Sequence, residues 1–467
     1  MVDLAGWRPR LDELTRRHQV PGASLAVLAG GEVATLATGV LHKGTGVEVT
    51  TDSLFQIGSM TKAYTATVVL ALVDQGLAGV DIPVAELLPG FRVADPEVSR
   101  RVTLRHLLCH TSGINGDFFL DTGRGDDCLA RYVEACAGLE QSHPLGATFS
   151  YCNSGYVILG RVIEQLTGVV WDAAVAEHLT APLGLAHTWT LPEDVLRFRA
   201  AMGHVTASPG EEPRPASSWY EMRSLGPAGL VCATAADAAT FARLHLDDGR
   251  APDGTRVLTA ASVAEMQRPQ VAVPNPFPMA SHWGLGWALS DWGGRRVFGH
   301  DGDTIGQSAF LRVVPDAGVA VVLLTNSDRT GAFHREVFTQ LLAELCDLTM
   351  PPPLEPPATP PDVDLRRHVG VYERVGMRIE ATLRDGDLFL EVTPTGALAD
   401  LLPASTVALV PLSDTLLVGK PPSATRWMPY VFSTLPNGTE FLHDGARATP
   451  KVRWRGRRAV ARSQPAT

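Results

Sequence analysis

Positive charge, and lysine in particular, is scarce in this chain. Its 40 basic residues face 50 acidic ones, which gives a formal net charge of −10. Nucleic acids and anionic membranes bind proteins through basic faces that displace counterions from phosphates, so neither is an expected partner. Only four of the basic residues are lysine: Lys43, Lys62, Lys420 and Lys451. Where this sequence retains lysine, we infer that arginine would not serve.

Clustered cysteines and long apolar runs are also missing. The six cysteines are scattered without CxxC or metal-ligand spacing, which is typical of reduced thiols and argues against zinc. No apolar run approaches the roughly 18 residues of a membrane-spanning helix. The first ten residues lack the apolar core of a signal peptide. We therefore expect a cytoplasmic protein with no membrane contact, no metal and no other cofactor.

The strand pattern predicts an α/β body in which antiparallel strands predominate. Two β-branched runs, 23–29 and 32–40, flank Gly30-Gly31 and predict a hairpin. Later strands are expected at 283–289, 296–298, 308–314 and 319–325, followed by an amphipathic helix over 333–348. The turns between these strands are too short for parallel crossovers, so the strands must be antiparallel neighbours.

Composition divides the rest of the chain. The segment from about 77 to 231 has mostly helical patterns and long loops, which predicts a helical insertion in a catalytic domain spanning 1–349. Residues 350–361 are proline-rich and are typical of a stiff linker. Beyond them, 362–467 alternates apolar residues with turn signals, which predicts a small antiparallel barrel or sandwich. Basic residues from Arg453 onward are expected to form a solvated tail.

The first chemical signal is the tetrapeptide Ser59 to Lys62, placed where a helix is expected to begin. Three residues are just under one helical turn, so the two side chains share a face. Crowding can lower the pKa of a lysine until it accepts a serine proton, which an arginine cannot do. The alternative is an ordinary helix cap at Ser59 and a surface lysine at 62.

Two further signals follow along the chain. Tyr151 can shuttle a proton beside an ammonium group, and Asn153 can hold a substrate carbonyl. A packed tyrosine remains the alternative. The third signal is the turn 299–303, whose two glycines allow a substrate to approach the backbone and whose N–H groups could help to form an oxyanion hole. Its alternative is a polar hairpin turn.

In this order, Ser-x-x-Lys, Tyr-x-Asn and His-x-Gly resemble the motifs of the serine β-lactamase and penicillin-binding-protein superfamily. The branch that looks most similar is the class C-like one, which includes D-aminopeptidases, carboxylesterases and acyltransferases. The resemblance covers roughly 11–348. It extends to the segments Phe55 to Lys62, Leu107 to Ile114, Tyr151 to Tyr156, Gly226 to Val231, and Pro315-Asp316 with Leu324 to Ser327.

The resemblance implies an antiparallel sheet flanked by helices, an all-helical subdomain and a site at their junction. It also implies that Ser59 is acylated and that Lys62 and Tyr151 exchange its proton. The remaining implied roles are substrate positioning by Asn153, a pocket wall at His300 and Gly302, and an oxyanion hole formed by the N–H groups of Ser59 and Asp303. The C-terminal segment resembles the lipocalin-like β-domains of some members.

This sequence departs from the β-lactamase pattern at the third motif, which has His300 followed by Asp301 where those enzymes usually have lysine. We expect Asp301 and Asp303 to repel anionic substrates and to favour an amine. The leading hypothesis is a serine hydrolase or acyltransferase acting on a small ester or amide, with an amine as a possible acceptor. The alternatives are a β-lactamase or DD-peptidase, and a non-catalytic penicillin-binding sensor.

Overall fold

The computed structural model describes residues 4–207, 210–219, 222–400, 403–422, 424 and 426–452. The chain forms two compact units. The first comprises Met1–Leu354 together with Gly445–Ala448, and the second comprises Glu355–Asp444 and Thr449–Thr467. The basic tail expected from Arg453 onward lies outside the described residues.

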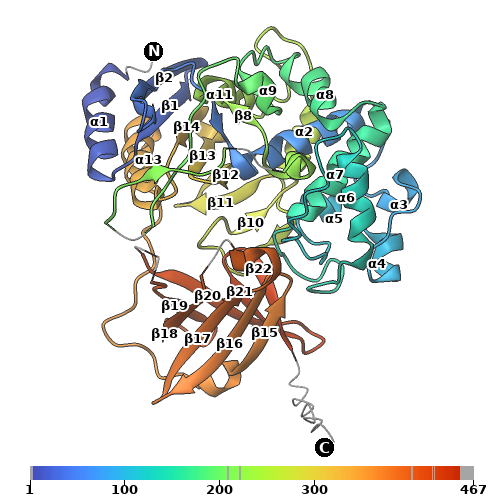
Figure 1. The fold of residues 1–467 in the computed structure, drawn as a ribbon, viewed down its shortest axis with the longest axis vertical. Helices are drawn as coiled ribbons and strands as arrows, with labels where there is room; N and C mark the ends of the chain where they lie inside the picture. Colours follow the sequence, from blue (N-terminus) through green and yellow to red (C-terminus); the bar gives the residue numbers. More distant parts are fainter. Residues whose placement is uncertain are drawn as a thin grey trace, which may run out of the picture. The chain divides into compact units, whose positions relative to one another are not determined.

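A nine-stranded antiparallel sheet forms the centre of the first unit (Figure 1). Its strands run in the order β3 (Val47–Glu48), β2 (Glu32–His42), β1 (Gly22–Ala29), β14 (Val319–Thr325), β13 (Gln307–Val314), β12 (Arg295–Thr304), β11 (Ala288–Trp292), β10 (His282–Trp283) and β9 (Val271–Ala272). Strand β1 pairs with β14, so segments about 300 residues apart in sequence are neighbours. Every residue of β14 is buried, which explains its unbroken apolar sequence.

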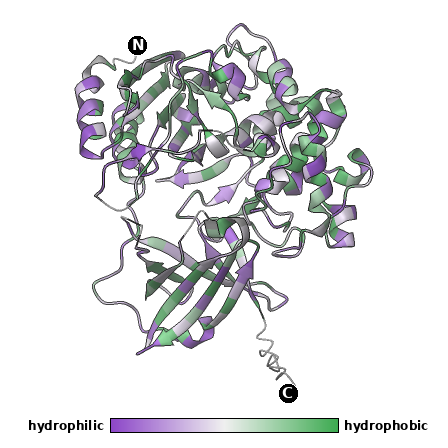
Figure 2. Cartoon of the chain, viewed as in Figure 1, coloured by the Kyte–Doolittle hydropathy of each residue, from purple (hydrophilic) through white to green (hydrophobic). Residues whose placement is uncertain are grey.

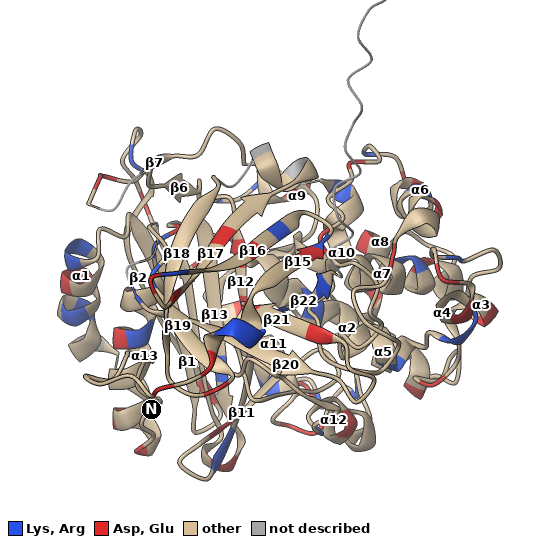
Figure 3. Ribbon diagram, turned by 90° about the horizontal axis from the view of Figure 1, so that it is seen from below, with Lys and Arg blue, Asp and Glu red and all other residues tan. Residues whose placement is uncertain are grey.

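Alternation along the strands gives the sheet two apolar faces. On one face, Leu25 and Val27 of β1 pack in a cluster with α1 (Arg8–Arg17) and α13 (Gly331–Cys346). On the other face, Ala26 and Leu28 pack in a larger cluster with α2 (Thr61–Asp74) and α11 (Ala235–Leu244). Figure 3 shows basic and acidic residues close together on α1. Its Arg10 and Arg17 form ion pairs with Glu344 and Glu336 of α13.

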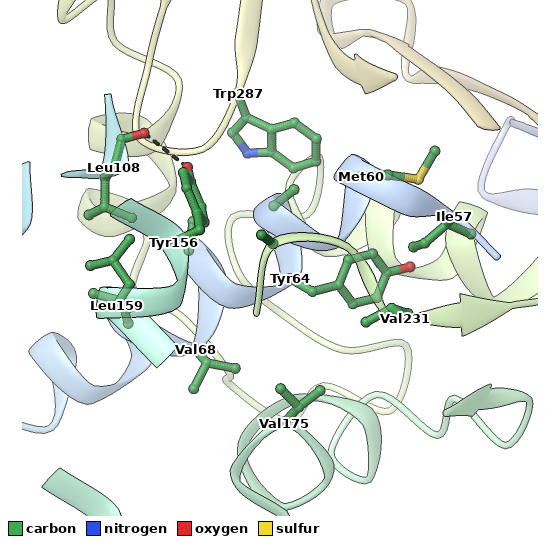
Figure 4. Packing of buried hydrophobic residues seen from close by; sticks show 14 of the residues in the cluster. Ile57, Met60, Tyr64, Val68, Leu108, Tyr156, Leu159, Val175, Val231 and Trp287 are labelled. Atoms are coloured by element: carbon green, nitrogen blue, oxygen red, sulfur yellow. Dashed lines mark hydrogen bonds between the residues drawn. The ribbon is translucent and has the colours of Figure 1, made fainter. Parts of the chain in front are cut away.

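Helix α2 is apolar on all sides because it is enclosed on all sides. Twelve of its 14 residues are buried. The Tyr64 ring stacks on Phe241 with 3.8 Å between centroids, and Figure 4 shows Tyr64, Val68 and Trp287 within the same core. A helix this constrained holds the residues at its N-terminus in fixed positions.

The other helices of this unit are mostly short. They are α3 (Val84–Leu87), α4 (Pro96–Arg101), α5 (Leu104–Leu108), α6 (Cys128–Ala135), α7 (Asn153–Thr167), α8 (Trp171–Val175), α9 (Pro192–Val195), α10 (Gly226–Gly229) and α12 (Ala260–Met266). Two small sheets complete the unit, β4 (Phe55–Gln56) with β8 (Cys232–Ala233) and β5 (Thr188–Trp189), and β6 (His204–Val205) with β7 (Arg214–Pro215). No helix among the described residues combines the length and apolarity needed to cross a membrane.

Eight strands close into an antiparallel barrel. They are β15 (Gly370–Arg374), β16 (Met377–Arg384), β17 (Asp387–Pro394), β18 (Ser405–Pro411), β19 (Leu416–Gly419), β20 (Met428–Thr434), β21 (Glu440–Asp444) and β22 (Arg447–Val452). Figure 2 shows hydrophobic and hydrophilic residues alternating along these strands. Side chains such as Ile379, Leu390 and Leu442 form its buried core. The interior is therefore packed with the barrel's own residues.

The predicted fold class is confirmed, but one predicted strand and one predicted turn are wrong. The residues 299–303, which were expected to form a turn, lie within strand β12 and pair with β13. The expected hairpin is β1 and β2, and the strand expected at 319–325 is β14. The strand expected over 283–289 is instead two strands, β10 and β11, paired with each other. Gly286 has a φ of +86° between them, a left-handed conformation that reverses the chain. The unbroken apolar pattern arises because this turn is buried.

Candidate active site

Ser59 lies on a tight turn that leads into α2. The turn is a 3-10 helix, Gly58–Met60, followed directly by Thr61. Strand β12 lies close against it. A Cβ atom at Gly302 would lie 2.0 Å from the Ile57 carbonyl oxygen, and one at Gly58 would lie 2.7 Å from the Asp303 backbone nitrogen. Two glycines thus allow the backbone N–H groups of Ser59 and Asp303 to come together, as an oxyanion hole requires.

Lys62 is completely buried one helical turn after Ser59. Its Nζ donates to the Ser59 Oγ at 3.0 Å and to the Ala228 carbonyl oxygen at 2.7 Å. The same nitrogen is 4.9 Å from the Tyr151 ring centroid and 5.7 Å from that of Tyr156. The lysine therefore lies where it can accept the proton of the Ser59 hydroxyl, and is not the surface residue of the alternative interpretation.

Tyr151 lies in the same group although it is 92 positions from Ser59. Burial raises the pKa of its phenol, while a hydrogen bond with the Ser59 side chain and the charge of Arg447 lower it. Burial outweighs both, so the resting phenol is neutral. The Tyr151 hydroxyl has no well-aligned hydrogen bond in this arrangement, which leaves it available to a reacting group. Figure 4 shows the neighbouring Tyr156, whose hydroxyl is bonded to the Leu108 carbonyl oxygen at 2.9 Å.

Asn153 is half-buried at the first position of α7. The preceding Cys152 caps the helix, because its Sγ accepts the Gly155 N–H at 3.2 Å. This cap fixes the Tyr-x-Asn segment at a helix N-terminus. Asn153 is thereby held at the start of this helix, two positions after Tyr151 in the sequence.

His300 lies on the side of β12 that faces the nucleophile turn, as Gly302 does. Its Nδ1 is 2.6 Å from the Asp301 carbonyl oxygen, to which it must donate. Burial, and then the charge of Lys62, lower the pKa of His300 to about 4. The ring is therefore neutral near pH 7 and presents an unprotonated Nε2. That atom is buried and without a hydrogen-bond partner.

The structure corrects the role expected of Asp301. Strand alternation turns its side chain to the opposite face from His300, and both of its carboxylate oxygens bind the Arg312 guanidinium there. Asp303 alternates in the same direction and accepts a hydrogen bond from the Ser308 hydroxyl at 2.7 Å. The Asp303 side chain is solvent-accessible, but desolvation of its carboxyl group by the surrounding protein raises its pKa. Of the two carboxylates expected in the pocket, Asp301 is therefore neutralised by Arg312, whereas the charge of Asp303 still acts on Tyr151.

Two residues of the site were not singled out from the sequence, His110 and Trp283. The His110 ring is 4.3 Å from the Tyr151 ring and 5.1 Å from that of Trp283. Its Nδ1 accepts the Cys152 N–H at 3.0 Å, so the proton lies on Nε2. Burial and the charge of Lys62 hold the pKa of His110 well below its ordinary value. His110 lies within the segment 107–114 that carries the resemblance, which was the available signal.

Asp117 and Arg447 were also missed. Arg447 Nη2 donates to Asp117 Oδ1 at 2.7 Å, and its Nε donates to Oδ2 at 3.1 Å. The guanidinium carbon is 5.1 Å from the Tyr151 ring centroid. Both residues belong to the first compact unit. Their separation of 330 positions left no local pattern in the sequence.

The site as described has the parts of a serine acyl-transfer centre. It has a hydroxyl, a buried amine, a phenol and converging backbone N–H groups. Within the part of the chain that the structure describes, no three His, Cys, Asp or Glu side chains gather as metal ligands.

Comparisons with known proteins identify a matching family and a similar relative. The family model described as "Beta-lactamase" matches residues 7–344. "Penicillin-binding protein 4" from Amycolatopsis lactamdurans is 54% identical over 376 residues, covering 80% of this chain and 98% of that protein.

Two solved structures are also similar. The SurE structure has a TM-score of 0.79 at 30% identity over 96% of this chain and 99% of its own, and a second SurE structure contains D-Leu. D-amino acid amidase from Ochrobactrum anthropi SV3, complexed with L-phenylalanine amide, has a TM-score of 0.58 at 25% identity over 70% of this chain and 92% of its own.

Proposed function

Because this chain belongs to the Beta-lactamase family, we propose that it transfers acyl groups through an ester formed on Ser59. The observation that carries the proposal is the fully buried Lys62, whose Nζ lies 3.0 Å from the Ser59 Oγ. Burying an ammonium group is costly, and a lysine placed this way serves to exchange a proton with the serine. A purely structural site would not need it.

The proposed reaction has two stages. The Ser59 oxygen attacks a substrate carbonyl while its proton passes to Lys62 in its neutral amine form or to Tyr151 in its deprotonated form, and the N–H groups of Ser59 and Asp303 hold the oxyanion. The same proton then goes to the leaving amine or alcohol as the carbon–heteroatom bond breaks. In the second stage, water or an amine attacks the acyl-serine and gives up its proton by the reverse path. Neutral His300 and His110 line the site without competing for that proton.

We further propose that the acyl group is a D-configured amino acid or a peptide ending in one, held as an amide or ester. Support comes from the names of the similar structures, one a D-amino acid amidase and the other crystallised with D-Leu. Chirality can be read at such a site because the attacked carbonyl, the Asn153 amide and the oxyanion N–H groups fix three directions around the α-carbon.

The experiment is intact-mass spectrometry after incubation with matched p-nitrophenyl esters of D- and L-phenylalanine. We expect an adduct on Ser59 that forms faster with the D-ester, and none in Ser59→Ala. An adduct that persists in Ser59→Ala would overturn the acyl-serine assignment. Equal rates for the two esters would overturn only the chirality.

β-Lactam or DD-peptide chemistry is a second candidate, favoured by the 54% identity to a protein named for penicillin binding. Incubation with benzylpenicillin distinguishes the possibilities. Rapid turnover identifies a β-lactamase, and a long-lived adduct without other turnover identifies a sensor. We expect neither to match the turnover of the preferred ester.

Transfer to an amine acceptor is the third part of the proposal. The two-carboxylate argument no longer supports it, because Asp301 is neutralised by Arg312 on the far face of β12. The remaining support is that the rings of Tyr151, Phe149 and Trp283 are buried against one another beside Lys62, an apolar wall of the kind that disfavours competing water. The measurement is the ratio of amide to free acid when a primary amine is added to the preferred ester.

A further inference from the structure

The backbone N–H of Tyr151 and the side chain of the preceding Ser150 are held by a segment from the far end of the sequence. Residues 445–448 belong to the first compact unit. Within it, the Tyr151 N–H donates to the Ala446 carbonyl oxygen at 2.9 Å, and the Ala448 N–H donates to the Ser150 Oγ at 3.1 Å. Two hydrogen bonds therefore fix residues 150 and 151 to this short segment.

Between these bonds, Arg447 extends toward Asp117. The pairing is bidentate, and the Asp117 side chain is only 5% exposed. The loop that carries Asp117 is itself tight against the tyrosine, because a Cβ atom at Gly116 would lie 2.7 Å from the Tyr151 carbonyl oxygen. A bidentate carboxylate defines the plane of a guanidinium as well as its distance. The charge of Arg447 is thus held in a defined place beside the phenol.

Two cationic groups consequently lie within reach of one aromatic ring. The Arg447 guanidinium carbon is 5.1 Å from the Tyr151 ring centroid, and the Lys62 Nζ is 4.9 Å from it. Both distances fall within the roughly 6 Å over which a cation and a ring attract each other. Moreover, a phenol that loses its proton gains far more from these charges than a neutral one does.

We propose that Arg447 is a positioning residue for Tyr151, holding its ring beside Lys62 and stabilising its deprotonated form, and that Asp117 limits this effect. The inference rests on the proposed acyl transfer at Ser59. It explains why a salt bridge formed across 330 residues of sequence lies at the back of a catalytic tyrosine.

Other charged and titratable groups around the phenol also influence the pKa of Tyr151. Besides Arg447 and Lys62, the titratable or charged groups near Tyr151 are Asp117, Asp303, His110, His300, Cys152 and Tyr156. Arg447 lowers the pKa of Tyr151, whereas Asp303 and Asp117 raise it. The two members of the salt bridge therefore act on the pKa of the phenol in opposite directions, as their opposite charges require, so removing either one should move that pKa in a predictable direction.

The test is the pH dependence of kcat/KM for the ester that acylates Ser59, in Arg447→Gln, Asp117→Asn and the double variant. Loss of a positive charge favours the protonated form of whichever group accepts the serine proton. We expect the limiting pKa to rise by about one unit in Arg447→Gln and to fall in Asp117→Asn. In the double variant it returns toward the wild-type value, and Arg447→Lys, which keeps the charge, stays close to wild type.

The matched control is Arg384→Gln, which removes another arginine that lies over a ring and is paired with a carboxylate. Its guanidinium carbon is 5.0 Å from the Phe389 ring centroid, and its partner is Glu391. The pH profile of this variant should not move. If Arg447→Gln fails to fold, the other two variants still test the proposal. The limiting pKa should fall in Asp117→Asn and should stay unchanged in Arg447→Lys.

Two results would overturn the inference. One is equal activity losses in Arg447→Gln and Asp117→Asn with unmoved profiles, which identifies a structural brace. The other is a raised KM confined to substrates that bear a carboxylate, which identifies a substrate-binding residue. Both differ from failure of the proposed function, in which wild type forms no adduct on Ser59 at all.

Discussion

At the scale of single residues, Lys62 offers the sharpest test, because its surroundings suit an amine and not a guanidinium. Its Nζ lies between the Ser59 hydroxyl and the Ala228 carbonyl oxygen, with no exposed surface. We expect Lys62→Arg to lower kcat by about 10² to 10⁴-fold, nearly as much as Lys62→Ala, because arginine stays protonated. The measurement is burst-phase acylation. Lys43→Arg, at a partly exposed lysine, is the control, and substantial activity in Lys62→Arg would reduce Lys62 to a fixed charge.

Tyr151→Phe separates proton transfer from packing. The change keeps the ring beside His110 and Lys62 and removes a hydroxyl that has no well-aligned partner. We therefore expect a loss of about 10² to 10⁴-fold in kcat with little change in the free energy of unfolding.

Tyr156→Phe is the matched control and should behave in the opposite way. It removes the hydrogen bond to the Leu108 carbonyl oxygen, which costs about 1 kcal/mol or more of stability, and should leave the chemical step intact. If Tyr151→Phe were as active as Tyr156→Phe, the phenol would have no part in the reaction.

At the scale of elements, the approach of β12 to the nucleophile turn depends on Gly302. An added Cβ would collide with the backbone of Ile57 and Ser59, which cannot yield as a flexible side chain can. We expect Gly302→Ala to separate the strand from the turn and to lower kcat about 10²-fold or more through the oxyanion hole. Gly331→Ala, at a glycine with no atom within 4 Å of the added Cβ, is the control. Wild-type kcat in Gly302→Ala would show that the hole lies elsewhere.

The sequence predicted these elements where local pattern and tertiary setting agree. The hairpin of β1 and β2 and the strand β14 follow from apolar β-branched runs bounded by turns, and α2 follows from Ser59 and the stop near Gly76. Prediction failed at residues 283–289, where a buried turn at Gly286 is as apolar as its flanking strands. It failed again at 299–303, which was expected to be a turn but continues strand β12, so that alternation turns Asp301 to the face opposite His300.

At the scale of the whole molecule, the site assembles residues that no local pattern connects. Ser59 and Lys62 share one helical turn, and Tyr151 could be paired with them only through the resemblance. Arg447 lies beyond the proline-rich segment, within a stretch whose alternation predicts a β-domain, yet it belongs to the first compact unit. Sequence periodicity indicates which helices and strands form. Which distant segments pack against each other depends on contacts between residues that are hundreds of positions apart.

Buried neutral histidines give the whole molecule a predictable pH dependence of stability. Burial lowers the pKa to about 4 for His143 and His300 and to about 3 for His245, and lowers that of His110 well below its ordinary value. Unfolded histidines titrate near 6.5, so between about pH 6.5 and 4 the unfolded chain binds more protons than the folded one. Stability is therefore fully present above pH 6.5 and is lost as the pH falls through this window.

Within its window, each such histidine changes the free energy of unfolding by up to about 1.4 kcal/mol per pH unit. Burial raises the pKa values of Glu164 and Asp237, so these two carboxyl groups act in the opposite direction and partly cancel the effect of the histidines. Urea unfolding at pH 7, 6 and 5 measures the slope. His245→Gln removes one of these titrations at a position that contacts Thr67 and Trp287 and not Ser59, so it should flatten the curve by close to one proton. A wild-type free energy of unfolding that stays constant from pH 7 to 5 would mean that these rings are hydrated or charged in the folded protein, and the neutral His300 of the proposed mechanism would be lost with them.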